Sequence, residues 1–166
     1  TVEQTLRHPT WKMGAKVSID SATLMNKAFE LIEARWLFDL PMEKIEAVIH
    51  RQSLVHALVQ FKDGNMQAVL GAPDMRIPLA YALFFPARRA NSLPRVDLSK
   101  LTLNFEKPDY SVLEGPKLAC AMMKMGGTMP ATLCIADEEA VNKFLVGEIS
   151  FLGIYDHIKR FLEKVK

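Results

Sequence analysis

Cysteine is scarce in this sequence, and its placement suggests neither a metal site nor a disulfide framework. The two cysteines, Cys120 and Cys134, are 14 positions apart. Neither belongs to a C-x-x-C motif or lies near a pair of histidines, as the ligands of structural zinc do. Such sparse, isolated cysteine is typical of a reducing compartment, which we therefore expect for this chain.

The sequence also lacks an excess of charge of one sign, a long apolar run and an initiator methionine. Its 166 residues include 21 basic and 19 acidic side chains, with a formal net charge of +2. Nucleic-acid binding needs a concentrated basic surface and a membrane span needs about 20 apolar residues, so we expect neither partner. The chain begins at Thr1 without a signal peptide's apolar core, and we expect it to be a fragment.

What the sequence does have is enough apolar content for a folded core. Hydrophobic residues make up 49% of the chain and charged residues 24%. A chain of this length buries roughly 70% of the surface that its unfolded form exposes. A disordered or collagen-like protein is therefore excluded.

The first half of the chain changes from a helical to a strand-like pattern. Apolar residues at helical spacing predict a helix over residues 22–39, with Asp20 or Ser21 as its N-cap. Apolar runs then predict three strands, at residues 45–50, 54–61 and 66–70. The pair Asp63-Gly64 favours a hairpin turn between the last two strands, with the first strand beside them in one small sheet.

The second half is dominated by helical periodicity. Residues 87–108 have a weak pattern with one apolar stretch at 101–105, which indicates a linker that contains one strand. Helices are predicted before this linker at residues 79–85 and after it at residues 116–124, 130–146 and 154–165. We expect an α+β fold, with a small mixed or antiparallel sheet and helices in residues 1–86 and a helical bundle in residues 109–166.

The densest group of polar side chains lies in residues 20–30. At 100° per residue, Asn26, Lys27 and Glu30 fall within about a 100° arc of one helix. Ser21, near the predicted helix start, adds a hydroxyl close to free backbone N–H groups, where an anion such as a phosphate is favoured. The alternative is a solvated face with a Lys27–Glu30 ion pair, worth at most about 0.5 kcal/mol.

Glu30 is also a candidate ligand for Mg²⁺ or Mn²⁺. These ions usually take a second carboxylate, and no fixed spacing in this chain supplies one. Glu33 lies on nearly the same helix face, and the pattern does not separate the two glutamates. The sequence by itself thus gives an incomplete metal site.

A second candidate is the aperiodic stretch over residues 8–14, which contains His8 and Trp11 between a proline and a glycine. An aromatic side chain on a loop can act as a lid that excludes water, beside which a histidine could donate to a substrate oxygen. Alternatively, Trp11 and Met13 cover the core. His50 and His56 are expected to be structural, because no third metal ligand is placed by the pattern.

Long runs of the sequence resemble the 1-deoxy-D-xylulose 5-phosphate reductoisomerase family. These runs are HPTWKMG at residues 8–14, KVSIDSATLMNK at 16–27 and ELIEARWLF at 30–38, with shorter ones at 49–53, 71–78 and 126–128. The resemblance implies reductive isomerisation of 1-deoxy-D-xylulose 5-phosphate to 2-C-methyl-D-erythritol 4-phosphate, in the non-mevalonate route to isoprenoids. It implies NADPH and a divalent metal (Mn²⁺, Mg²⁺ or Co²⁺) as cofactors.

The resemblance also implies roles for single residues. Ser21, Asn26 and Lys27 match positions that hold the substrate, largely its phosphate, and Glu30 matches a carboxylate that binds the metal beside the substrate. The remaining positions are two substrate contacts in a mobile loop, His8 and the lid aromatic Trp11, and four positions at the NADPH, Met13, Gly14, Pro73 and Met75. Catalysis is expected of Glu30, Lys27 and His8.

The chain departs from this family in what precedes these runs. A family member begins with a Rossmann-type dinucleotide-binding domain and an Asp-Ser-Glu motif that supplies further metal ligands, and neither is present here. We therefore expect residues 1–86 to be part of a catalytic domain and the fragment alone to be inactive. The resemblance further implies a homodimer in the bacterial cytoplasm, or in a plastid for a plant or apicomplexan source.

Two rival functions remain open at this point. One is a non-catalytic phosphate-binding or interaction module that keeps the serine, the amide and the lysine without chemistry. The other is a purely structural helical domain. Glu30 disfavours the first rival, because a pure anion site has no use for a carboxylate that faces the same ligand.

Overall fold

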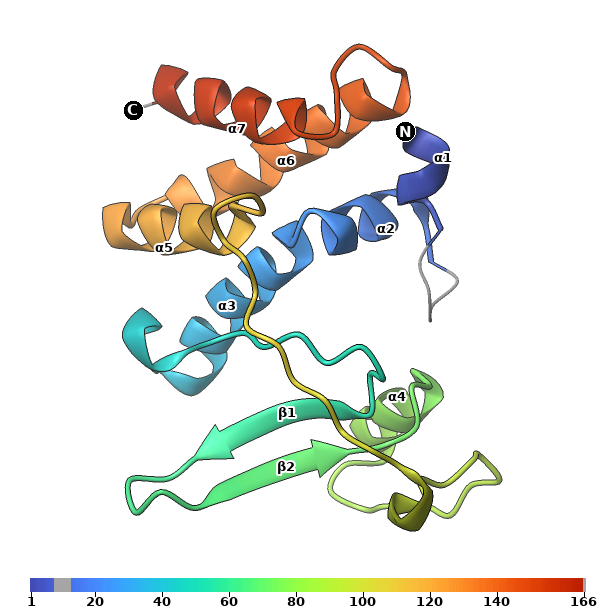
Figure 1. Ribbon diagram of the computed structural model, residues 1–166. Helices are drawn as coiled ribbons and strands as arrows, with labels where there is room; N and C mark the ends of the chain where they lie inside the picture. Colours follow the sequence, from blue (N-terminus) through green and yellow to red (C-terminus); the bar gives the residue numbers. More distant parts are fainter. Residues whose placement is uncertain (8–12, 166) are drawn as a thin grey trace. The chain divides into compact units, whose positions relative to one another are not determined.

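The computed structural model describes residues 1–7 and 13–165 of the chain, which form two compact units (Figure 1). The helical unit comprises Thr1–Ala47 and Pro108–Lys166, and the strand unit comprises Val48–Lys107. The helical unit contains α1 (Val2–Thr5), α2 (Ala15–Ala22), α3 (Met25–Phe38), the 3₁₀ turn Met42–Lys44, α5 (Gly115–Met125), α6 (Met129–Leu145) and α7 (Gly153–Lys164). The strand unit contains β1 (Val55–Gln60), β2 (Met66–Leu70), α4 (Arg76–Phe84) and the 3₁₀ turn Leu98–Lys100.

The core of the helical unit lies between α2 and α3 on one side and α5, α6 and α7 on the other, as the ribbon shows (Figure 1). Its most deeply buried large side chains are Ile19, Met25, Leu133, Ile154 and Ile158. Ile154 and Ile158 are one helical turn apart on α7, and Leu133 lies on α6. The predicted helices at residues 116–124, 130–146 and 154–165 are confirmed to within about two residues.

The predicted helix over residues 22–39 is wrong at its start. The chain is already helical from Ala15, and the helix is interrupted at Thr23–Leu24 before α3 begins at Met25. Leu24 has a left-handed backbone with φ 56°, which a leucine adopts only where its surroundings hold it there. Ser21 therefore lies in the last turn of α2 and is not an N-cap.

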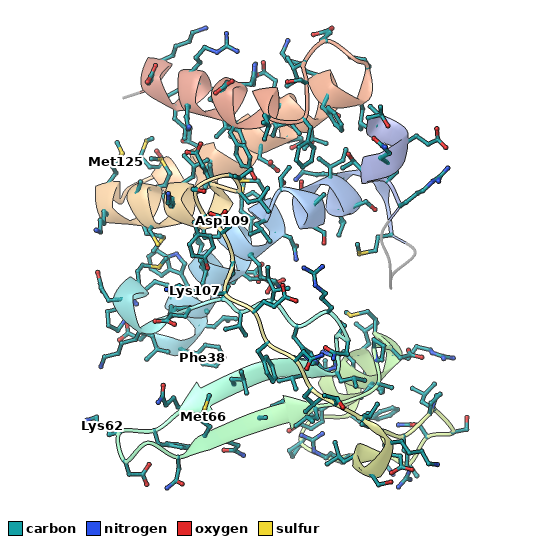
Figure 2. The ribbon with its side chains drawn as sticks, in the orientation of Figure 1. Phe38, Lys62, Met66, Lys107, Asp109 and Met125 are labelled. Atoms are coloured by element: carbon teal, nitrogen blue, oxygen red, sulfur yellow. The ribbon has the colours of Figure 1, made fainter. Side chains whose placement is uncertain are left out.

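The strand unit confirms the predicted hairpin. β1 and β2 pair antiparallel with Gln60 opposite Met66, and the connecting turn includes Gly64 with φ +91°. The Asn65 N–H donates to Asp63 Oδ1 at 3.0 Å, which fixes this turn. Figure 2 shows Lys62 in the loop and Met66 at the start of β2, whose side chain is exposed.

The predicted strands at 45–50 and 101–105 are not formed. These segments meet in a single bridge between Ile49 and Glu106, and the sheet has two strands. The reason lies in the side chains, because His50 Nδ1 lies 2.8 Å from the Asn104 carbonyl oxygen and Gln52 Nε2 donates to that of Thr102 at 2.9 Å. The side chains thereby occupy carbonyls that a continuous ladder would use.

The grouping by contact differs from the division predicted from the sequence. Residues 1–47 belong with the carboxyl-terminal helices rather than with the hairpin. The physical reason is that α3 packs along α5 and that α2 also contacts α6. Within the described residues, no helix is long and apolar enough to cross a membrane.

Candidate functional site

The first two turns of α3 bring together three of the predicted site residues, Asn26, Lys27 and Glu30, which we name the α3 cluster. Asn26 Nδ2 donates to Glu30 Oε1 at 2.7 Å, and Lys27 Nζ donates to Glu30 Oε2 at 2.5 Å. The Lys27 and Glu30 side chains are 41% and 47% exposed. The amide, the ammonium and the carboxylate are thus accessible to a ligand, whose polar groups could replace the hydrogen bonds that the three side chains make to one another.

The start of α3 also provides backbone donors. Leu24 is the N-cap, so Met25, Asn26 and Lys27 occupy the first turn, where backbone N–H groups have no partner within the helix. The Met25 N–H is bonded to the Thr23 hydroxyl at 3.4 Å. The free N–H end of the helix, which was predicted near Ser21, therefore lies at Met25, Asn26 and Lys27, and the positive end of the helix dipole there adds to the Lys27 charge.

The structure distinguishes Glu30 from Glu33 by their surroundings, which the sequence pattern cannot do. Both Glu30 carboxylate oxygens are engaged by Asn26 and Lys27, whereas Glu33 lies close enough to Cys134 of α6 to raise the pKa of that thiol, together with burial. In the part of the chain that the structure describes, no group of three His, Cys, Asp or Glu could hold a metal ion. The Glu30 carboxylate suits Mg²⁺ or Mn²⁺ chemically, but as one ligand of several.

The remaining predicted site residues are placed as follows. Gly14 is the N-cap of α2, and a Cβ atom built there would meet none of the described residues within 4 Å; the neighbouring Met13 is half-buried. Met75 is the N-cap of α4 in the strand unit and is exposed, while Pro73 is half-buried. The predictions for His8 and Trp11 lie outside the described residues.

An ionic group that was not predicted from the sequence links α2 to α6, with two buried carboxyl groups and a lysine that is 40% exposed. Lys16 Nζ donates to Asp20 Oδ2 and to Asp137 Oδ2, each at 2.6 Å. The Asp137 side chain is fully buried and that of Asp20 is 7% exposed. We name Asp20 and Asp137 the acid pair. A signal was present in the sequence, since Asp137 interrupts the apolar stripe of α6 between Leu133 and Val141.

The acid pair does not ionise like two surface carboxyl groups. Burial raises the pKa of Asp137 to about 6, and the charge of Asp20 adds to this effect. Burial also raises the pKa of Asp20, against the opposing influence of Lys16. Burial alone would lower the pKa of Lys16, but its bonds to the two carboxylates outweigh this and raise it. One lysine thus serves two carboxyl groups, which favours a proton on one of them.

The acid pair also leaves hydrogen-bonding capacity unused. Asp20 Oδ1 and Asp137 Oδ1 are buried, and neither has a partner among the described residues. Other titratable neighbours are Cys134 of α6, whose pKa is raised by burial and by both carboxylates, and Tyr155 of α7, whose pKa is raised by burial, by Glu114 and by Asp137. The group therefore joins α2 to α6 through Lys16.

A concave surface lies elsewhere in the helical unit, between α6 and α7. It is lined by Glu139, His157, Arg160, Phe161 and Lys164, none of which was predicted as a site residue. His157 Nε2 lies 3.0 Å from Glu139 Oε1, so the histidine is already paired.

Comparison with known proteins relates both ends of the chain to one enzyme. Residues 70–166 match the family described as DXP reductoisomerase C-terminal domain, and residues 1–38 match the 1-deoxy-D-xylulose 5-phosphate reductoisomerase C-terminal domain. The 1-deoxy-D-xylulose 5-phosphate reductoisomerases of Geobacillus sp. (strain WCH70) and Symbiobacterium thermophilum are each 51% identical over 99% of this chain. The chain spans 44% and 43% of their lengths, respectively.

Solved structures give the same relation. The reductoisomerase from Zymomonas mobilis in complex with NADPH has a TM-score of 0.90 and 41% identity over 99% of this chain and 42% of its own. A DOX-P reductoisomerase in complex with NADPH, fosmidomycin and magnesium has a TM-score of 0.89 and 42% identity over 98% of this chain and 40% of its own.

Proposed function

Since the chain belongs to the 1-deoxy-D-xylulose 5-phosphate reductoisomerase family, we propose that it supplies the α3 cluster to that reaction. The reaction is the NADPH-dependent reductive isomerisation of 1-deoxy-D-xylulose 5-phosphate to 2-C-methyl-D-erythritol 4-phosphate. The observation that carries this proposal is the gathering of Asn26, Lys27 and Glu30 in the first two turns of α3.

Three side chains hold the substrate in this proposal. The Lys27 ammonium balances the phosphate charge at the positive end of the α3 dipole. The Asn26 amide and the Ser21 hydroxyl donate to phosphate or substrate hydroxyl oxygens. Lys27 and Asn26 leave Glu30 when they turn to the substrate, so binding of the phosphate frees the carboxylate.

Glu30 is proposed as one metal ligand as well as a neighbour of the substrate hydroxyls. A bound divalent ion supplies Lewis-acid stabilisation of negative charge on substrate oxygens. The solved relative with magnesium and fosmidomycin supports this assignment, together with the exposure of the carboxylate. The described residues contain no group of three His, Cys, Asp or Glu that could hold such an ion, so Glu30 is proposed as one ligand of an incomplete set.

The proposal extends to the NADPH side of the reaction. Met13 and Gly14 are proposed to contact NADPH at the start of α2, where Gly14 has no side chain and no described residue within 4 Å of a Cβ position. Pro73 and Met75 are proposed to pack near the nicotinamide. His8 is proposed to contact the substrate and Trp11 to cover it.

A homodimer and a cytoplasmic location complete the proposal. The two-stranded sheet supports pairing of subunits, because β1 and β2 each have one unpaired edge and carry exposed apolar side chains. Light scattering of the purified protein tests the dimer.

The activity is tested with a chimaera in which this chain replaces the corresponding part of the Geobacillus relative. NADPH oxidation is followed with 1-deoxy-D-xylulose 5-phosphate and Mg²⁺, with the unaltered relative as a positive control and circular dichroism as a check of folding. The proposal predicts turnover by the chimaera. A folded, inactive chimaera that still binds inorganic phosphate would favour the non-catalytic phosphate-binding module.

Two glutamates of α3 then test the metal assignment. Glu30→Gln should lower kcat of the chimaera by about 100-fold or more, because an amide is a poor ligand for a hard cation and carries no charge. Glu33→Gln is the matched control on the same helix and should stay within about twofold, as is usual for exposed residues without such contacts. Calorimetry with fosmidomycin and Mg²⁺ should show the same contrast, and full activity of Glu30→Gln would refute the assignment.

A further inference from the structure

The interruption between α2 and α3 is held by a tyrosine from the other end of the chain. The Tyr155 hydroxyl donates to the carbonyl oxygen of Thr23, 132 positions away in the sequence. Tyr155 is 2% exposed and Thr23 is fully buried. No other hydrogen bond to this carbonyl oxygen is found in the part of the chain that the structure describes. The contact therefore satisfies a buried acceptor that the end of α2 leaves open.

The start of α5 supports the same place from a second direction. A Cβ atom at Gly115 would lie 2.6 Å from the Leu24 carbonyl oxygen, so the backbones of α5 and of the interruption approach as closely as a glycine allows. The residue before it, Glu114, forms an ion pair with Lys159, with Lys159 Nζ 2.7 Å from Glu114 Oε2. Lys159 lies one helical turn after Tyr155 on α7. One face of α7 thus contacts both the interruption, through Tyr155, and the start of α5, through Lys159.

The interruption decides how the site is arranged. Ser21 lies on α2, whereas the α3 cluster begins two residues after the left-handed Leu24. A continuous helix would keep these groups at fixed 100° steps, so the departure at Thr23–Leu24 sets their relative directions. The Thr23 hydroxyl adds to this, because it donates to the Ile19 carbonyl at 2.9 Å and accepts from the Met25 N–H.

We infer that Tyr155 is a positioning residue for the phosphate-holding groups of this chain. Its hydroxyl holds the Thr23–Leu24 interruption, and through it the direction of Ser21 relative to the α3 cluster. Burial raises the pKa of this hydroxyl, so it stays a donor throughout the physiological range. The effect of Tyr155 on substrate binding rests on the proposed function. Its effect on the angle between α2 and α3 does not.

The geometric effect is tested on the chain itself with Tyr155→Phe, which removes one oxygen and keeps the ring. Residual dipolar couplings of backbone amides measure the angle between α2 and α3. The expected result is a changed angle and faster hydrogen exchange at Leu24 and Met25, with the α6 and α7 couplings unchanged. Tyr110→Phe, a half-buried tyrosine of the same unit, is the matched control and should change none of these.

The functional effect is tested by the same variants in the chimaera. Tyr155→Phe should raise KM for 1-deoxy-D-xylulose 5-phosphate about tenfold, with kcat within about threefold and KM for NADPH unchanged, because uniform substrate binding is lost. An unchanged helix angle overturns the inference. Equal losses for substrate and NADPH overturn it too, since they indicate a merely structural role. An inactive unaltered chimaera refutes the proposed function and leaves the dipolar-coupling result standing.

Discussion

Replacement of Asp137 by asparagine should make the helical unit more stable at neutral pH. Asparagine has nearly the same shape, keeps an oxygen that accepts from Lys16, and provides an N–H that can donate to Asp20. The Asp137 carboxyl group can donate to Asp20 only while it is protonated, and at neutral pH it loses that proton. The variant thereby removes the cost of a second negative charge in a buried group that contains one lysine.

The sign and size follow from the pKa. That of Asp137 is raised by burial from 3.8 to about 6 in the folded chain. The folded state therefore binds more protons than the unfolded state in this window, and the contribution of Asp137 is fully present below pH 3.8 and lost as the pH rises through 6. The rise in pKa corresponds to a loss of about 3 kcal/mol of unfolding free energy as the pH increases over the whole window. About 2 kcal/mol of this loss occurs between about pH 4.5 and 7.5.

The assay is urea unfolding followed by circular dichroism at these two pH values. The difference in unfolding free energy between Asp137→Asn and the unaltered chain should grow in favour of the variant by about 2 kcal/mol from the lower to the higher pH. Asp156→Asn, an exposed aspartate of α7, is the control and should give a constant difference. Parallel curves for Asp137→Asn and the unaltered chain would refute the account of the acid pair.

Further outcomes are expected for the glycines and the thiols. Gly115→Ala should lower the unfolding free energy by about 3 kcal/mol, because its Cβ would meet the Leu24 carbonyl oxygen at 2.6 Å. Gly14→Ala, whose Cβ would meet none of the described residues within 4 Å, should change it by less than about 0.5 kcal/mol in the same denaturant titration. Ellman's reagent should find both thiols free, and the half-buried Cys120 should react slowly near neutral pH because burial raises its pKa; a fast reaction of Cys120 would contradict this.

Several features of the fold follow from local sequence patterns. The helices α5, α6 and α7 were predictable because apolar residues recur every three or four positions and glycine or proline marks their ends. The hairpin followed from Asp63-Gly64 between two apolar runs. The α3 cluster was also predictable, because residues three and four apart on a helix are neighbours whatever the rest of the chain does.

The errors arise where distant segments override a local preference. Residues 45–50 have the composition of a strand, but side chains of His50 and Gln52 bind the opposing backbone and limit the pairing to one bridge. The residues around Leu24 have the periodicity of one continuous helix. Contacts from α5 and α7 hold a left-handed residue there, which the local sequence would not adopt by itself.

The sequence by itself determined the helices α5, α6 and α7 and most of α3, where the hairpin turns, and which three polar side chains share the start of α3. Only the tertiary structure decided that α2 ends before that cluster, that Tyr155 holds the interruption and that Lys16 meets Asp137, 121 positions along the chain. The physical reason is range: helix faces and turns arise from neighbours a few residues apart. The acid pair and the left-handed Leu24 exist only because the packed core brings together groups that the sequence keeps far apart.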